Sequence, residues 1–257
     1  MVRAVIAIPC FAASFAVPAQ DGAHVPPDAP VQPMPDMPAS SMVDVMQMDD
    51  DARFGLFKLD QFERGTAGGN PFGWEAEAWY GRDFDKIWLR SEGEHADARL
   101  DARTELFWDH AFASFWDWQL GGRHDSGTGP NRSWLAFGAQ GLAPYWFEIE
   151  ATAYVGEQGR TAARFRAEYE LLFTQQLILQ PELELNLYGK SDPAREVGSG
   201  LSDATFGLRL RYEIRREFAP YVGVVWTRRF GEAADFARAD ARDPQDTQFV
   251  VGLRTWF

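Results

Sequence analysis

The clearest pattern in the chain is an alternation of apolar and polar residues that runs from Leu177 to Tyr188. Leucines and Pro181 hold the odd-numbered positions, and from Gln180 onward glutamates, Asn186 and Tyr188 hold the even-numbered ones. Successive side chains of a β-strand point to opposite faces, so an extended segment here has an apolar face and a carboxylate-bearing face. A helix would spread leucine and glutamate around its whole circumference. The pattern therefore predicts a strand.

The same alternation recurs in twelve runs after Arg53, and turn-forming residues separate the runs. A soluble sheet would tolerate lysine freely on its polar face, whereas lysine is rare here. An even number of runs, with about 17 residues for each run and its connection, suits transmembrane strands of about 9 to 11 residues. We therefore predict an all-β fold for residues 53–257, a transmembrane antiparallel up-and-down β-barrel of about 12 strands whose apolar faces contact lipid. The predicted strands are Phe54–Glu63, Phe72–Gly81, Ile87–Glu94, Leu100–Trp108, Phe115–His124, Asn131–Gly141, Tyr145–Val155, Arg160–Phe173, Leu177–Tyr188, Leu208–Arg215, Pro220–Phe230 and Gln248–Phe257.

Aromatic residues fit this prediction. The chain has 10 Trp, 7 Tyr and 20 Phe, which is typical of aromatics used at a membrane interface. The run that starts at Tyr145 predicts Tyr145 on the outer face and Trp146 on the inner face. The last run ends on Phe257, and a terminal aromatic on an amphipathic strand resembles the insertion signal of bacterial outer-membrane barrels.

The first 52 residues have a different composition. Residues 1–19 combine Arg3 with an apolar run and a Val-Pro-Ala sequence, which predicts a signal peptide that is cleaved after Ala19. The single cysteine, Cys10, lies inside it, so we expect a mature chain without disulfides. Residues 20–52, called the arm below, hold seven Asp, six Pro and five Met but no Lys, Arg or aromatic residue. Such a segment buries too little apolar surface to order itself, and we predict a disordered periplasmic arm.

Methionines in the arm are candidate metal ligands. A disordered segment has no core for methionine to fill, and soft thioethers select Cu(I). His24 and the aspartates are harder ligands that suit Cu(II). A compositional accident in a Pro-rich linker is the alternative. The candidate ligands are Met34, Met37, Met42, Met46, Met48 and His24.

Charged residues on the inner face are the second candidate site. The formal net charge of -13 argues against nucleic acid as a partner, because phosphates are bound through basic surfaces. Arginines and carboxylates can pair bidentately in a confined lumen, where we expect a mainly structural role. His95, His110 and His124 are predicted to lie too far apart to form one site, so we expect no enzymatic activity. The predicted lumen charges are Glu148, Glu150, Arg164, Arg166, Glu168, Glu182, Glu184, Arg209 and Arg211.

Several stretches resemble one family: 140–154 (QGLAPYWFEIEATAY), 177–181 (LILQP), 185–190 (LNLYGK), 198–202 (GSGLS) and 210–221 (LRYEIRREFAPY). They look like the copper resistance protein B family. This resemblance implies a copper-binding protein of the Gram-negative outer membrane that helps to export or sequester copper, alongside periplasmic copper-handling partners. Family members often carry Met- and His-rich repeats before the barrel, and the scarcity of His here favours Cu(I) over Cu(II). The alternative is a structural barrel or general porin that affects copper only through envelope permeability.

Overall fold

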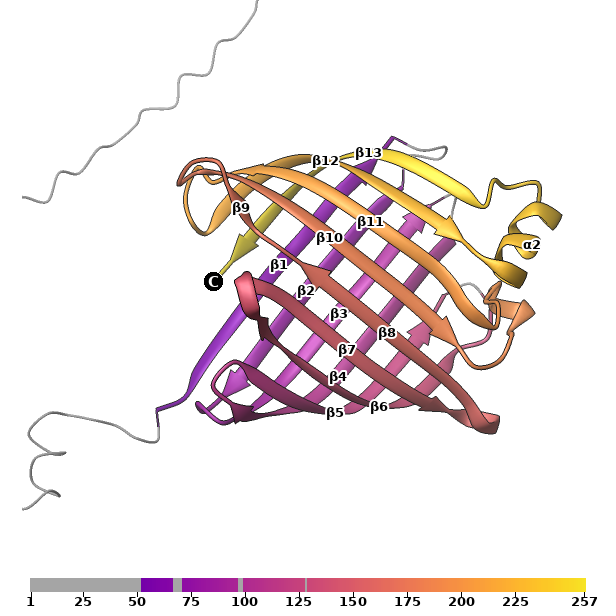
Figure 1. Cartoon of the computed structure of the whole chain (residues 1–257), viewed down its shortest axis with the longest axis horizontal. Coiled ribbons are helices and arrows are strands. Elements are labelled where there is room, and N and C mark those ends of the chain that lie inside the picture. The colour runs from indigo at the N-terminus through magenta and orange to yellow at the C-terminus, as the bar shows by residue number, and fades with distance from the viewer. Residues whose placement is uncertain (1–51, 67–70, 97–98, 128) are drawn as a thin grey trace, which may run out of the picture. The chain divides into compact units, whose positions relative to one another are not determined.

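The chain forms a closed antiparallel β-barrel in the computed structural model, which describes residues 52–66, 71–96, 99–127 and 129–257 (Figure 1). Twelve long strands follow one another around the wall, and the barrel closes where the first pairs with the last. A two-residue strand, β9, also pairs with β10. The predicted fold class is therefore confirmed. The strands are β1 (Phe54–Gly65), β2 (Phe72–Gly81), β3 (Asp85–Ala96), β4 (Arg99–Ala113), β5 (Trp116–Ser126), β6 (Arg132–Ala143), β7 (Phe147–Gly156), β8 (Arg160–Glu168), β9 (Leu171–Leu172), β10 (Leu177–Tyr188), β11 (Gly200–Tyr212), β12 (Phe218–Arg229) and β13 (Gln245–Trp256).

Alternation along each strand separates an outer face from a lumen face. In β6, Leu135 is 74% exposed on the outer face, although its neighbours Trp134 and Ala136 are only 7% and 1% exposed on the lumen face. The pairing register places apolar residues opposite apolar residues, and charged residues opposite charged residues, on neighbouring strands. Leu185 of β10 lies opposite Phe165 of β8, whereas Glu184 lies opposite Arg166. Apolar rows therefore meet apolar rows on the outside, and charged rows meet inside.

The two ends of the barrel differ. The terminal rim holds the start of β1, the end of β13 and the short turns that follow β2, β4, β6, β9 and β11. The loop rim, at the opposite end, holds the connections that follow β1, β3, β5, β7, β10 and β12. Figure 1 shows the C-terminus at one end and helix α2 (Gly231–Ala239) at the other.

Helix α2 was not predicted from the sequence. It has nine residues, and its buried face consists of Ala233, Ala234 and Ala237, which contribute little to an apolar pattern. It packs against β11 and β12. The Glu232 carboxylate accepts hydrogen bonds from the backbone N–H (3.2 Å) and hydroxyl (3.1 Å) of Ser199, so the helix is tied to the loop that follows β10.

The predicted strand Arg160–Phe173 is divided into β8 and β9. Tyr169, between them, lies opposite Pro181 of β10 and donates its backbone N–H to the Pro181 carbonyl at 3.1 Å. An ordinary residue at position 181 would return a hydrogen bond to Tyr169, but proline has no N–H. One proline in β10 therefore interrupts the ladder without changing its register, since Glu168 pairs with Glu182 and Leu172 with Ile178.

The prediction that a strand begins at Tyr145 was wrong. Pro144–Trp146 form a 3-10 turn (η1) between β6 and β7, and β7 begins at Phe147. Tyr145 and Trp146 have φ values of 69° and 67°, so both are left-handed and neither occupies a strand face.

The predicted signal peptide (1–19) and all but Ala52 of the arm lie outside the described residues. In the described ranges, no helix is long and apolar enough to cross a membrane.

Candidate functional site

Arginine side chains link strands across the lumen. Because Glu150, Arg166 and Glu184 share one row through the registers of β7, β8 and β10, opposite charges are neighbours on the wall. Arg164 of β8 reaches further and donates to Glu92 of β3 at 2.6 Å and to Glu184 of β10 at 2.8 Å. This guanidinium therefore connects strands that are not adjacent in the barrel wall.

A second group of ion pairs surrounds Glu182. One of its carboxylate oxygens lies 2.9 Å from Arg166, and the other accepts a hydrogen bond from Arg209 at 2.7 Å. Arg209 also forms a bidentate pair with Glu63 of β1, with both distances at 3.0 Å. Arg166 pairs in addition with Glu75 of β2. Bidentate geometry of this kind suits the planar guanidinium and fixes the orientation of both partners.

Nearer the terminal rim, Arg211 donates to Glu170 at 2.6 Å and to Gln180 at 2.7 Å. Asp60 of β1 lies 2.8 Å from Arg254 and 3.1 Å from Lys58. The first pair of contacts ties β11 to β10 and to Glu170, and the Asp60–Arg254 contact ties β1 to β13 where the barrel closes. The predicted lumen charge Glu148 is exposed at the mouth of this rim, at the start of β7.

Eight charged side chains in the middle of the barrel are at most 8% exposed. Buried charges are costly to desolvate unless they are paired, and each of these has an oppositely charged partner within 4.0 Å. They fill the lumen at this level. We call this set the charge layer: Asp60, Glu75, Arg90, Glu105, Glu150, Arg164, Arg166 and Glu168.

Between the charge layer and the loop rim the lumen widens into a cavity of about 1100 Å³, which we call the vestibule. Glu75, Glu182 and Arg209 line the end that meets the charge layer, whereas Arg132 and Asp240 line the end at the loop rim. The space is large enough for hydrated ions or a small molecule.

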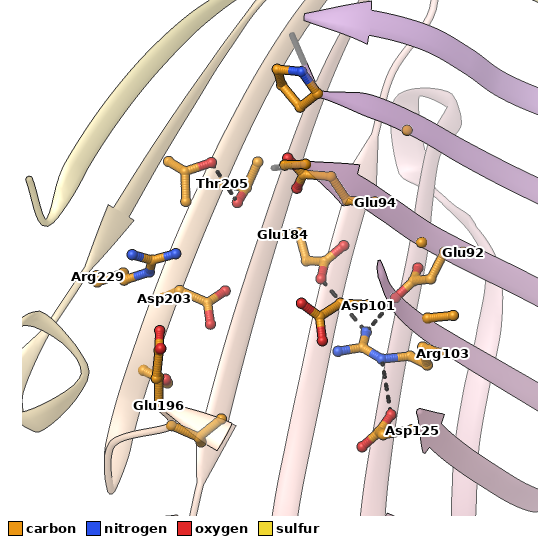
Figure 2. A pocket seen from close by; sticks show the side chains of 18 of the residues that line it. Glu92, Glu94, Asp101, Arg103, Asp125, Glu184, Glu196, Asp203, Thr205 and Arg229 are labelled. Atoms are coloured by element: carbon orange, nitrogen blue, oxygen red, sulfur yellow. Dashed lines mark hydrogen bonds and ion pairs between the residues drawn. The ribbon is translucent and has the colours of Figure 1, made fainter. Parts of the chain in front are cut away.

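Carboxylates from several strands converge on the vestibule (Figure 2). Arg103 holds three of them, with distances of 2.6 Å to Glu92 and 3.8 Å to both Glu184 and Asp125. Figure 2 also shows Glu94 and Asp203 on the same cavity, away from Arg103. Asp203 accepts a hydrogen bond from the Asn186 amide at 2.8 Å. Oxygen ligands of this type attract cations, but within the described ranges no group of three or more His, Cys, Asp or Glu side chains is placed to hold a metal ion.

A basic cluster stands at the loop rim. Arg132 and Arg160 both donate to the Asp192 carboxylate, at 2.9 and 2.8 Å, and Arg195 lies nearby. Burial acts to raise the pKa of Asp192, but the hydrogen bond from Arg132 and the charges of the three arginines outweigh it. The pKa is therefore held below its usual range.

The structure brings eight of the nine predicted lumen charges into ion-paired contact inside the barrel, and Glu148 alone stands at the mouth. The predicted arm ligands Met34, Met37, Met42, Met46, Met48 and His24 lie outside the described residues. His95 lies in β3 near the loop rim, His124 contacts Ser133 at 3.0 Å, and His110 contacts Asp85 at 2.9 Å near the terminal rim. These three histidines do not converge.

Sequence reasoning did not single out several lumen residues. Arg90, Glu105 and Arg123 are at most 4% exposed and form buried contacts, including a hydrogen bond of 2.7 Å from the Tyr154 hydroxyl to Glu105. Their alternation with apolar neighbours was visible in the sequence, so the signal existed. What the sequence lacked was the register that shows which charges meet.

Comparisons with known proteins agree with this architecture. The family model for the copper resistance protein B precursor matches residues 53–257. A copper resistance protein B homolog from Pseudomonas syringae pv. tomato is 48% identical over 213 residues, which cover 82% of this chain and 72% of the relative. Copper resistance protein B from Escherichia coli is 44% identical over 204 residues, which cover 79% and 69%. Among solved structures, the NanC porin matches with a TM-score of 0.53 at 10% identity, covering 79% of this chain and 99% of the porin, which shows the barrel fold alone. The chain belongs to the copper resistance protein B family.

Proposed function

We propose that this protein is a non-catalytic barrel of the Gram-negative outer membrane that binds copper ions and helps to export or sequester them. Membership of the copper resistance protein B family carries the proposal. The outer face supports the membrane location, because exposed apolar residues such as Leu135, Phe137, Val222 and Val251 cover it. A contiguous exposed apolar surface of this extent is typical of contact with lipid.

Copper has two binding regions of different chemistry in this proposal. The methionines of the arm supply thioethers for Cu(I), and the vestibule supplies carboxylates such as Glu94 and Asp203, which suit Cu(II) as weaker, harder ligands. Periplasmic copper-handling proteins are the partners that would exchange copper with the arm. The first strand, β1, begins at the terminal rim, which is the end of the barrel opposite the vestibule.

Metal analysis of the purified full chain tests this proposal. The protein is equilibrated with Cu(I) under reducing conditions or with Cu(II) without reductant, and retained copper is then counted per chain. We expect Met→Leu replacement of all five arm methionines to lower Cu(I) retention selectively. Glu94→Gln with Asp203→Asn should lower Cu(II) retention. The matched control is Asp83→Asn with Glu217→Gln, which removes two exposed carboxylates from turns of the terminal rim.

Copper binding would be refuted if the wild-type protein retained no more copper than an unrelated barrel does. A second candidate function is a structural barrel that affects copper only through envelope permeability. The charge layer favours it, since paired side chains fill the lumen there. Copper flux into vesicles that contain the protein, measured together with copper retention, separates the two functions. A barrel that is only structural should show neither copper flux nor retained copper.

A further inference from the structure

Asp109 of β4 carries a fully buried carboxyl group on the terminal-rim side of the charge layer. It is 0% exposed, as is Gln119, the residue opposite it on β5. The Gln119 amide donates a hydrogen bond to Asp109 Oδ2 at 3.2 Å, and the Gln140 amide of β6 donates to the same oxygen at 2.9 Å. One oxygen of this carboxyl group therefore has two donors, and both donors are uncharged.

The second oxygen of the carboxyl group, Oδ1, lacks a donor. Asp109 Oδ1 and Gln119 Oε1 are both sealed from solvent, and neither has a hydrogen-bond partner among the described residues. A carboxylate oxygen and an amide carbonyl oxygen are both acceptors, so neither can satisfy the other. Buried acceptors without a donor are destabilising, most of all when they carry charge.

The charged neighbours of Asp109 do not neutralise it as arginines neutralise the charge layer. Lys86 of β3 and Asp117 of β5 face it, and the facing group from β6 is the uncharged Gln140. Lys86 Nζ lies 3.9 Å from Asp109 Oδ1, which is beyond hydrogen-bonding distance, and 3.7 Å from Asp117 Oδ2. The same ammonium group lies 5.8 Å from the centre of the Trp79 ring. A carboxylate at position 109 would thus be a buried charge that shares one distant cation, which is a costly arrangement.

We propose that Asp109 is a proton-binding site, in which the neutral carboxylic acid donates its Oδ1 proton to Gln119 Oε1. The Gln119 amide already donates to Oδ2, so the two planar groups form a cyclic pair with one hydrogen bond in each direction. A single proton gives both unpaired oxygens a partner and removes the buried charge. An ordered water molecule could pair with the two oxygens, but it would leave the charge in place.

The bound proton sets the charge of the lumen next to the terminal rim. With Asp109 neutral, Lys86 has Asp117 as its carboxylate partner, and the Asp117 side chain is 23% exposed near the start of β5. Loss of the proton would create a second carboxylate beside Asp117. Because aspartates of the unfolded chain are ionised at neutral pH, the folded barrel holds one proton more at this position. The contribution of Asp109 to stability therefore decreases as the pH rises.

Replacement by asparagine separates an acid from a carboxylate, because asparagine has the shape of protonated aspartic acid and can donate the same hydrogen bond. The matched control is Asp60→Asn. Asp60 is 3% exposed in the same lumen, but one of its oxygens lies 2.8 Å from Arg254 and 3.1 Å from Lys58. In urea unfolding of the barrel in lipid vesicles, Asp109→Asn should leave the midpoint unchanged at neutral pH. Asp60→Asn should raise the unfolding equilibrium constant roughly tenfold or more, because it leaves two cations without their carboxylate.

Infrared spectroscopy of the folded barrel detects the proton directly, since the C=O stretch of a protonated carboxyl group is separate from the bands of carboxylates and amides. The spectrum of the wild type at neutral pH, minus that of Asp109→Asn, should contain one such band. The same subtraction with Asp60→Asn should contain none. Raising the pH should weaken the Asp109 band and lower the stability of the wild type relative to Asp109→Asn.

A stable Asp109→Asn variant without this difference band would assign water, not a proton, to the two oxygens and overturn the proposal. Destabilisation of Asp109→Asn as large as that of Asp60→Asn would show that Asp109 is a carboxylate. Lys86→Met decides the question if Asp109→Asn does not fold. A neutral Asp109 predicts a small change for Lys86→Met, because the remaining partner, Asp117, is partly exposed to water, whereas a loss as large as that of Asp60→Asn would overturn the proposal.

Discussion

Replacement of Arg164 by methionine is the sharpest test of how the lumen charges stabilise the barrel. Arg164 is 2% exposed and has carboxylates of Glu92 at 2.6 Å, Glu184 at 2.8 Å and Glu105 at 3.9 Å. Methionine has a similar length but no charge, so Arg164→Met leaves three carboxylates in the lumen without this shared partner. Removal of one member of a buried ion pair typically destabilises a protein by about 3 to 5 kcal/mol.

A control for this prediction lies in α2. The Arg238 side chain is 61% exposed and pairs at 2.7 Å with Asp235, which is 72% exposed. Water screens such pairs, which contribute about 0 to 1 kcal/mol, so Arg238→Met should change the free energy of unfolding very little. A short distance alone therefore does not predict stability. Burial of the pair decides the difference between the two variants.

The measurement is equilibrium unfolding by urea of the barrel in lipid vesicles, with the free energy taken from the transition midpoint and slope. Glu184→Gln added to Arg164→Met should recover part of the loss, because it removes one of the uncompensated buried charges. Equal effects of Arg164→Met and Arg238→Met would show that water reaches the middle of the lumen. In that case the charge layer would not be a sealed layer, and the argument for it would fail.

Three further predictions follow from local geometry. Because the pKa of Asp192 is lowered by its arginine neighbours, its ion pairs contribute stability above about pH 4, the usual carboxyl pKa, and lose it as the pH falls through the lowered value. Proteolysis of the loop 189–199 should therefore increase at acid pH in the wild type, whereas Asp192→Asn should be cleaved readily at every pH. Gly121→Ala should destabilise the barrel by about 1 to 3 kcal/mol, because a Cβ there would lie 1.9 Å from a backbone oxygen, while Gly122→Ala, with its nearest atom at 3.4 Å, should be tolerated. Pro181→Leu should supply the missing N–H opposite Tyr169, and the new amide should show slow hydrogen exchange if the ladder is restored.

The fold could be predicted because its main determinant is local. Alternation with period two sets the face of each side chain, and Leu177–Tyr188 was predicted with the bounds that β10 has in the structure. Errors arose where another rule dominated. Pro181 lies in a different strand from the one that it interrupts, so no pattern within Arg160–Phe173 could show the break between β8 and β9. At Tyr145 the aromatic alternation continued through residues that form a turn.

The candidate site was predictable only in part, because pairing depends on register between distant strands. That Arg164 and Glu184 face the lumen follows from their neighbours in sequence. That Arg164 also reaches Glu92, which is 72 residues earlier in the chain, depends on the closure of the barrel. The vestibule carboxylate Glu94 could likewise be assigned to a face, but not to a cavity, before the ring of strands was known.

The position of the charge layer restricts how the two proposed copper regions can communicate. β1 begins at the terminal rim, the vestibule opens at the loop rim, and the charge layer lies between these two ends of the barrel. An ion that crossed the lumen would have to displace guanidinium groups such as Arg164 and Arg166 from their carboxylates, and each rupture would leave buried charge uncompensated. Direct transfer through the static barrel is therefore opposed by the same ion pairs that stabilise it. Copper bound in the vestibule, as proposed above, would then be held on the loop-rim side unless the arginines rearranged together, so Arg164→Met should speed copper flux across vesicles while it lowers stability.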